Sequence, residues 1–166
     1  MKNSILITLF TFALFLGGCD SNSSERAIGF VTGENSDSQW QLGTQEAIDV
    51  VNIVDELWTN QDYEGMRPYF ADSVVVLRPN GISTSTFDSF IESISIGDNA
   101  SWSYDYAFSV DLDPSIGGEH VQAGFTVTYP ATDEREEYTN QQHESYYVVD
   151  GKIITLSQYS IRGNNQ

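Results

Sequence analysis

Positively charged residues are scarce in this sequence of 166 residues. It contains 7 lysines and arginines against 24 aspartates and glutamates, which gives a formal net charge of -17 at pH 7. Phosphate backbones repel so acidic a chain, so the composition excludes nucleic-acid binding as a function. The same charge disfavours electrostatic docking on anionic lipid.

Cysteine and histidine are scarce as well. The single cysteine, Cys19, excludes an internal disulfide framework and a zinc site built from cysteines. The two histidines, His120 and His143, lie far apart with no fixed carboxylate partner, which is a poor signature for a metal site. The sequence also has no hydrolase-triad spacing and no glycine-rich phosphate loop. We therefore expect neither a metal nor a cofactor.

No apolar run is long enough to span a membrane as a helix, which takes roughly 20 residues. The run from Ile5 to Leu16 follows the positive Lys2 and precedes small residues, which predicts a signal peptide. Leu16-Gly17-Gly18-Cys19 resembles the lipobox of bacterial lipoproteins. In that family the signal, here 1–18, is cut before the cysteine, which is then acylated. The alternative is an ordinary secretory signal in which Cys19 stands by chance.

The lipobox resemblance implies a protein of the cell envelope, lipid-anchored to the inner or outer membrane and facing the periplasm or the surface. Each buried acyl methylene contributes about 0.8 kcal/mol, and we expect membrane contact through this anchor only. Residues 19–43 are rich in serine, asparagine, aspartate and glycine, which predicts a flexible tether. Phe30, Val31 and Trp40 are its candidates for docking on the domain, although no periodicity predicts a regular element there.

The remaining range, 44–162, is predicted to form one domain. Apolar residues recur every three or four positions over 44–60, which predicts an amphipathic helix, and two further helices are expected over 62–70 and 86–96. A β-branched run predicts a strand over 73–78, and alternation in steps of two predicts strands over 101–112 and 121–129. Two more strands are expected over 137–149 and 152–161, on either side of the Asp150-Gly151 hairpin signal. This order is typical of an α+β fold in which a curved antiparallel sheet wraps around one long N-terminal helix. In the strand over 101–112, alternation places Trp102, Tyr104, Tyr106 and Phe108 on one face.

Two stretches, DELWTNQDYEGMRPYFADSVVVLRPNG and ESYYVVDGKIITLSQYS, resemble the nuclear transport factor 2-like superfamily, and within it the SnoaL-like domain. The resemblance rests on Asp62 opening a helix, on Tyr69-Phe70-Ala71-Asp72 before a strand, and on Asp150-Gly151-Lys152-Ile153. It covers 44–162 and implies a cone-shaped, cystatin-like fold with a pocket between the concave sheet and the first helix. Isomerases, dehydratases, cyclases and binding modules all use this fold, so the resemblance does not name a function.

The steroid-isomerase branch of the superfamily can be aligned with this chain without a gap from the first helix to the first strand. Its oxyanion-hole tyrosine then falls on Val54, its base aspartate on Arg78, and its second acid near Gln142 to Glu144. Val54 has no proton to donate and Arg78 cannot act as a base, so we do not expect that chemistry. Arg78 instead predicts a guanidinium at the pocket wall, which favours an anionic group on a ligand. The alternative is that Arg78 pairs with a local carboxylate.

Three further side chains are candidates for the predicted pocket. Trp58 lies one helical turn beyond Val54 and either fills the core or forms a stacking wall for a ring-bearing ligand. Gln158 offers an amide. His143 would point inward together with Tyr147 and Val149, and its near-neutral titration suits general acid–base catalysis. His120 has the opposite parity to Val121 and is expected to face outward.

Three functions are compatible with these observations. The first is a lipoprotein whose domain binds a small, partly apolar molecule that carries an anionic group, with Trp58, Arg78 and Gln158 as ligand contacts. The second is a cofactor-free enzyme of the dehydratase or cyclase type that uses His143. The third is an interaction module, because the resemblance implies a homodimer through the outer face of the sheet. The strand residues to test on that face are Thr126, Thr128, Thr139 and Gln141.

Overall fold

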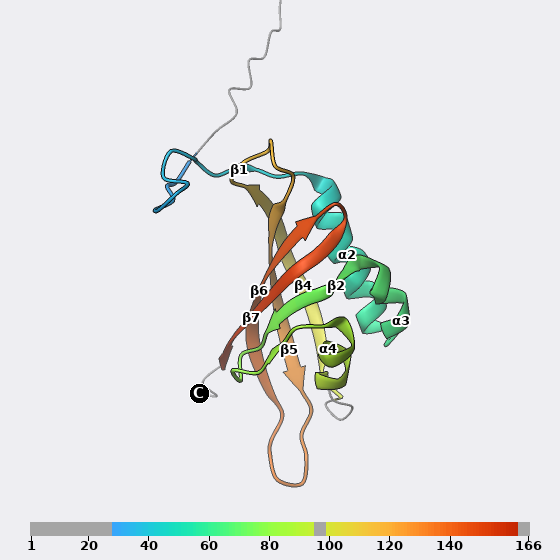
Figure 1. Ribbon diagram of the computed structural model, residues 1–166. Helices are drawn as coiled ribbons and strands as arrows, with labels where there is room; N and C mark the ends of the chain where they lie inside the picture. The colour runs from blue at the N-terminus through green and yellow to red at the C-terminus, as the bar shows by residue number, and fades with distance from the viewer. Residues whose placement is uncertain (1–27, 95–98, 163–166) are drawn as a thin grey trace, which may run out of the picture.

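A curved sheet and a layer of helices form the molecule (Figure 1). A computed structural model describes residues 28–94 and 99–162. The strands in these ranges are β1 (Gln41–Leu42), β2 (Phe70–Leu77), β3 (Ser83–Thr84), β4 (Ser101–Asp111), β5 (Glu119–Tyr129), β6 (Tyr138–Val149) and β7 (Lys152–Arg162). They form a sheet of order β1-β4-β5-β6-β7-β2-β3, in which β2 and β7 are parallel and the other neighbours antiparallel. The predicted α+β class, with a curved and mainly antiparallel sheet, is confirmed.

The long helix α2 (Gln45–Thr59) packs against the concave side of this sheet. Its side chains at Ala47, Val51 and Val54 are buried, as the three- and four-residue spacing predicts. Thr44 caps the helix by accepting a hydrogen bond from the Ala47 N–H at 3.3 Å. Two short helices, α3 (Tyr63–Met66) and α4 (Phe87–Ser93), and a 3-10 turn, η1 (Arg67–Tyr69), complete the helical layer.

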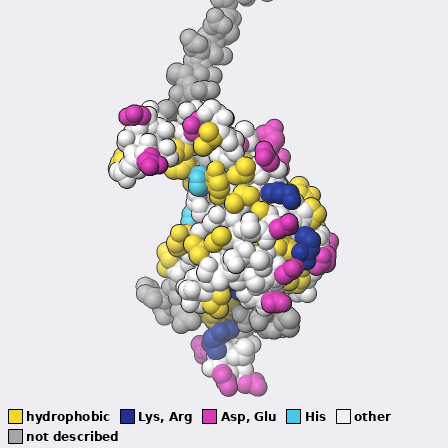
Figure 2. Space-filling view, in the orientation of Figure 1, with side chains coloured by type: hydrophobic (Ala, Val, Ile, Leu, Met, Phe, Trp, Pro, Cys, Tyr) yellow, Lys and Arg dark blue, Asp and Glu magenta, His cyan; other side chains and the backbone are white. Residues whose placement is uncertain are grey.

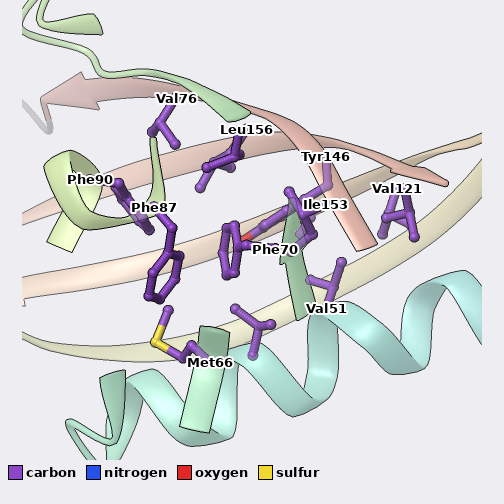
Figure 3. Packing of buried hydrophobic residues seen from close by; sticks show 14 of the residues in the cluster. Val51, Met66, Phe70, Val76, Phe87, Phe90, Val121, Tyr146, Ile153 and Leu156 are labelled. Atoms are coloured by element: carbon purple, nitrogen blue, oxygen red, sulfur yellow. The ribbon is translucent and has the colours of Figure 1, made fainter. Parts of the chain in front are cut away.

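The hydrophobic core lies between the helices and the part of the sheet built from β2, β5, β6 and β7. Figure 3 shows Phe70, Phe87 and Phe90 together, with Met66 beside them. The rings of Phe70 and Phe90 lie 5.7 Å apart between centroids, and Leu156 of β7 is fully buried. This cluster joins α4 to the sheet, so the helical layer and the strands share one core.

The β6–β7 hairpin follows its sequence signal. Asp150 and Gly151 have positive φ angles of 49° and 74°, the conformation that a two-residue hairpin turn of this type requires. The pairing of β6 with β7 then shifts by one residue, because Val148 pairs with Ile153 whereas Tyr147 pairs with Thr155. Ile154 is therefore the extra residue of a β-bulge.

A second bulge divides β4 between the two faces of the sheet. Tyr104 pairs with Phe125, but Tyr106 pairs with Gly124, so one residue of β4 has no partner. The predicted row of four aromatic residues on one face is therefore wrong. Trp102 and Tyr104 face the concave side and are partly buried, whereas Tyr106 and Phe108 are exposed on the outer face.

Strand β1 lies inside the range 19–43 that the sequence assigned to a tether. Gln41 pairs with Asp111 and Leu42 with Val110, and the Gly43 N–H donates to the Ser109 carbonyl at 2.9 Å. The paired part of the chain therefore begins before Thr44. The predicted signal peptide and lipobox, 1–19, lie outside the described residues. Within the described ranges, none of the helices has the length and apolar character needed to cross a membrane.

Candidate functional site

A fully buried carboxyl group lies on the concave face of the sheet. In β6 the residues that face inward are Glu144, Tyr146 and Val148, each with at most 5% of its surface exposed. The prediction that Tyr147 and Val149 point inward is therefore wrong by one residue. It follows that His143 and Ser145 lie on the outer face, and that Glu144 takes the interior position.

Three donors surround the Glu144 carboxyl. The amide nitrogens of Gln142 and Gln158 donate to Oε1 at 2.5 and 2.7 Å, and the Tyr146 hydroxyl donates to Oε2. Burial nevertheless raises the pKa of Glu144, because removing the carboxylate from water outweighs these bonds. Burial and the neighbouring Glu144 also raise the pKa of Tyr146. The Glu144 carboxyl can therefore hold its proton at a higher pH than an exposed glutamate does.

Helix α2 and strand β4 add a second carboxyl and a phenol to this interior. The Trp102 ring N–H donates to Asp55 Oδ1 at 2.9 Å, and burial raises the pKa of Asp55. Burial raises the pKa of Tyr104 to about 12, and the nearby charges of Asp55 and Glu144 act in the same direction. The Tyr104 hydroxyl oxygen is buried and has no hydrogen-bond partner among the described residues. Asp55, Tyr104, Glu144 and Tyr146 are called the interior polar cluster below.

Aromatic rings enclose the interior polar cluster. Trp58 contacts Phe90 and Trp102 edge to face, with centroids 5.4 and 6.4 Å apart. Tyr104 stacks on Phe125 at 4.8 Å. Trp58 is partly buried and packs against the hydrophobic core, which is the first of the two roles considered from the sequence. Gln158 also reaches this interior, where it binds Glu144 rather than presenting a free amide.

Arg78 binds the end of helix α4 and, among the described residues, does not pair with a carboxylate, which was the alternative considered from the sequence. Its Nη1 donates to the backbone carbonyl and, at 3.4 Å, to the hydroxyl of Ser93, the last residue of α4. A positive group suits this helix end, where carbonyl groups lack partners. Among the described residues, Arg78 makes no ion pair with a carboxylate, and its Nε is buried without a partner.

His143 belongs to a hydrogen-bonded chain on the outer face. The Gln122 amide nitrogen donates to Ser145 at 2.8 Å, which leaves the Gln122 oxygen to accept from His143 Nε2 at 2.9 Å. His143 Nδ1 can then accept from the Tyr106 hydroxyl at 3.2 Å. His143 therefore cannot serve as an acid or base inside the cone.

His120 faces outward, as predicted, but it is covered. Trp40 packs edge-on against its ring at 5.3 Å, and Tyr147 lies 4.7 Å away on another side. Burial lowers the pKa of His120. A surface hollow of about 190 Å³ opens beside it, lined by His120, Ser145, Tyr147, Thr155 and Ser157. In the described ranges, no three histidine, cysteine or acidic side chains gather as a metal site would require.

Sequence reasoning missed Asp55 as a site residue. It offered Tyr104 and Tyr146 only among several tyrosine hydroxyls, and it placed an acid only approximately, near Gln142 to Glu144. The signal that could have found Glu144 is the alternation of Gln142, Glu144 and Tyr146, three groups able to bond one another on one face. Asp55 carried no such signal. It lies between the apolar positions of α2, as the exposed residues Asn52 and Glu56 also do, so the sequence does not distinguish it from them.

Comparison with known proteins identifies the fold. No protein-family model and no curated protein matches the sequence. A candidate ketosteroid isomerase from Kribbella flavida is similar in structure, with a TM-score of 0.61 and 9% identity over 75% of this chain and 84% of that one. So is an NTF2-like protein of unknown function from Cytophaga hutchinsonii (TM-score 0.52, 10% identity, 69% and 89% covered). An LEH-like epoxide hydrolase from M. tuberculosis is a third (TM-score 0.54, 12% identity, 71% and 84% covered). The chain therefore has the nuclear transport factor 2-like fold, and identities this low show the fold alone.

Proposed function

We propose that this chain is a lipoprotein, anchored to the bacterial cell envelope through Cys19, whose domain binds a small, partly apolar molecule on the concave side of its sheet. The observation that carries the binding proposal is the Tyr104 hydroxyl, which is buried beside Glu144 without a partner. A buried hydroxyl without a hydrogen bond costs stability, and a ligand that accepts or donates a hydrogen bond would remove that cost. Proteins of this fold that are named as an isomerase or an epoxide hydrolase support a small-molecule role.

The chemistry of the interior limits what the ligand can carry. The rings of Trp58 and Trp102 suit an apolar or ring-bearing body. Asp55 and Glu144 would repel an anionic group placed next to Tyr104, so the part of the ligand bound there is uncharged. An anionic group, as predicted from Arg78, would have to lie toward the end of α4. A cofactor-free enzyme of the dehydratase or cyclase type would have to use Glu144 or Asp55 in place of His143.

Native mass spectrometry of the protein released from its own membranes tests this proposal. We expect a small molecule to be retained by the parent chain and to be lost or strongly reduced in Tyr104→Phe. Tyr106→Phe is the matched control, because it removes the same hydroxyl two residues away on the outer face. Equal retention by the two variants, or a parent chain that carries no ligand from any membrane fraction, would overturn the binding proposal.

A second candidate function, homodimer formation, is favoured by the outer face of the sheet. Tyr106, Phe108, Tyr159 and Ile161 are each about half exposed or more on this face. Thr126 and Gln141, which bond each other there at 3.1 Å, lie within it as predicted. We expect Tyr159→Arg to convert a dimer into a monomer in analytical ultracentrifugation. A parent chain that sediments as a monomer at high concentration would exclude this function.

A further inference from the structure

Apolar side chains are unusually exposed at the end of the molecule where the described chain begins. Phe30 and Leu42 expose 80% and 81% of their surface, Ile116 72% and Ile28 58%. These fractions exceed those of the other exposed large apolar residues in the described ranges, except Ile161 at 74% and Tyr159 at 58%. Single exposed apolar residues are ordinary, but several at one end of an acidic protein indicate a contact surface.

The backbone pairing places these residues at the same end of the sheet. Ile28 forms an isolated bridge with Trp40, immediately before β1. Leu42 of β1 pairs with Val110, near the end of β4. Ile116 belongs to the turn that joins β4 to β5, where its N–H donates to the Asp113 carbonyl at 3.1 Å. Figure 1 shows the start of the described chain, β1 and this turn together at one end of the cone.

The length of chain before Ile28 decides how far this end can lie from a lipid anchor at Cys19. A fully extended chain spans at most about 3.6 Å per residue, so the segment from Cys19 to Ile28 reaches roughly 30 Å. Strand β4 alone, which runs from the opposite end of the sheet, is about 36 Å long at roughly 3.3 Å per residue. The end that carries Ile28 is therefore the one that must stay close to the bilayer.

The distribution of charge agrees with that orientation. The β5–β6 hairpin at the opposite end carries Asp133, Glu134, Glu136 and Glu137, and Figure 2 shows acidic side chains gathered at its tip. Moving these carboxylates out of water and into a bilayer interface would cost free energy, and they lie away from the lipid when the β1 end faces it. Glu34 and Asp37 lie near the apolar residues, so the lipid contacted should carry little net charge.

We propose that Ile28, Phe30, Leu42 and Ile116 form a lipid-contact surface, which inserts into the headgroup region of a zwitterionic bilayer and holds the β1 end of the domain against it. This inference rests on the anchoring at Cys19 proposed above, and it adds a direct contact between the folded domain and the membrane. Apolar side chains gain free energy when they leave water for the bilayer interface, and a tethered domain does so without a further loss of translational freedom.

Quenching of Trp40 fluorescence by brominated phosphatidylcholine tests the contact in the full-length lipidated protein, reconstituted in phosphatidylcholine vesicles. Trp40 lies between Ile28 and β1, whereas Trp58 and Trp102 pack inside the cone, and a Trp40→Phe variant isolates its signal. We expect bromines placed near the headgroup to quench Trp40. The double variant Phe30→Ser with Leu42→Ser should lower this quenching at least twofold.

Ile82→Ser is the matched control, because Ile82 is an exposed apolar residue that lies in the turn between β2 and β3, at the opposite edge of the sheet from β1. Equal quenching in the double variant and in the parent, or an equal loss in the control, would overturn the lipid-contact surface. The anchor is tested separately by the acylated mass of Cys19 and by the loss of membrane attachment in Cys19→Ser. An acylated protein whose Trp40 is not quenched would refute the contact while leaving the anchor in place.

Discussion

Replacing Tyr104 by phenylalanine should stabilise the protein in the absence of ligand, because the change deletes a buried hydroxyl that has no partner among the described residues. Leaving such a group unsatisfied costs about 1–3 kcal/mol. The Tyr104 ring is only partly buried, so we expect the low end of this range, a gain of about 1 kcal/mol. The stacking of the ring on Phe125 and its other packing contacts are unchanged in the variant.

Urea denaturation of the ligand-free domain, followed by tryptophan fluorescence, measures this gain. In a chain of this size, about 1 kcal/mol corresponds to a rise in melting temperature of roughly 2–4 °C. Tyr106→Phe should instead lose about 0.5 kcal/mol or less, because its hydroxyl bonds to His143 on the exposed face. With saturating copurified ligand, the parent should instead become more stable than Tyr104→Phe. The variant would bind the ligand roughly tenfold more weakly if one hydrogen bond of about 1.4 kcal/mol is lost.

A destabilisation of Tyr104→Phe by about 1 kcal/mol or more would refute the reasoning. That result would mean that the hydroxyl has a structural partner, and that the interior polar cluster is complete without a ligand. An unchanged m-value in the same titration would show that the two variants unfold from equally compact states, so that the comparison holds.

Three further predictions concern Glu144, Glu119 and Gly124. Burial raises the pKa of Glu144 above its ordinary value of 4.5. The stabilisation from this bound proton is therefore complete at pH values below 4.5, and it is lost as the pH rises through the pKa of the folded state. The free energy of unfolding should therefore rise from pH 7.5 to pH 5 in urea titrations, and Glu144→Gln should reduce that rise; a variant with the same slope as the parent would contradict it. Glu119 accepts from Thr44 Oγ1 and Ser109 Oγ at 2.7 and 2.6 Å, so Glu119→Ala should cost about 2 kcal/mol in thermal unfolding, whereas Glu56→Ala on the exposed side of α2 should cost under about 0.5 kcal/mol. A Cβ on Gly124 would lie 2.1 Å from the Tyr106 ring, so Gly124→Ala should displace that ring and shift the NMR signals of His143, with a stability loss of about 1 kcal/mol or less; unchanged signals would show that the ring does not lie there.

Elements with a strong period were predictable from the sequence. Helix α2 lies at Gln45–Thr59 against an expected 44–60, because its apolar positions keep the helical spacing over four turns. The β6–β7 hairpin was equally predictable, since Asp150-Gly151 demands a turn of one geometry. The helix expected over 62–70 divides instead into α3 and η1. Pro68 accounts for the break, because it has no N–H for a regular helical bond.

The facing of β6 could not be settled by alternation alone. Tyr146 and Tyr147 are both aromatic, and Val148 and Val149 are identical, so the apolar end of the strand fits either face equally well. Choosing Tyr147 sends His143 inward, and choosing Tyr146 sends Glu144 inward. What decides the matter is satisfaction of hydrogen bonds. Gln142 and Tyr146, on the same face as Glu144, both bond its carboxyl, whereas an inward His143 would have Gln141 and Ser145 beside it.

The partner strand settles the same choice through one extra residue. Counted back from the turn at Asp150-Gly151 without interruption, Gln158 would lie opposite His143, and the interior carboxyl would face Ser157 instead. The bulge at Ile154 shifts the pairing by one position, so that Gln158 lies opposite Glu144 and donates to it. The bulge in β4 acts likewise, because it leaves Tyr104 inside and turns Tyr106 outward. The positions of Gln158 and Tyr104 in the interior thus both depend on inserted residues. Counting alternating positions in a single sequence does not reveal where such an insertion lies.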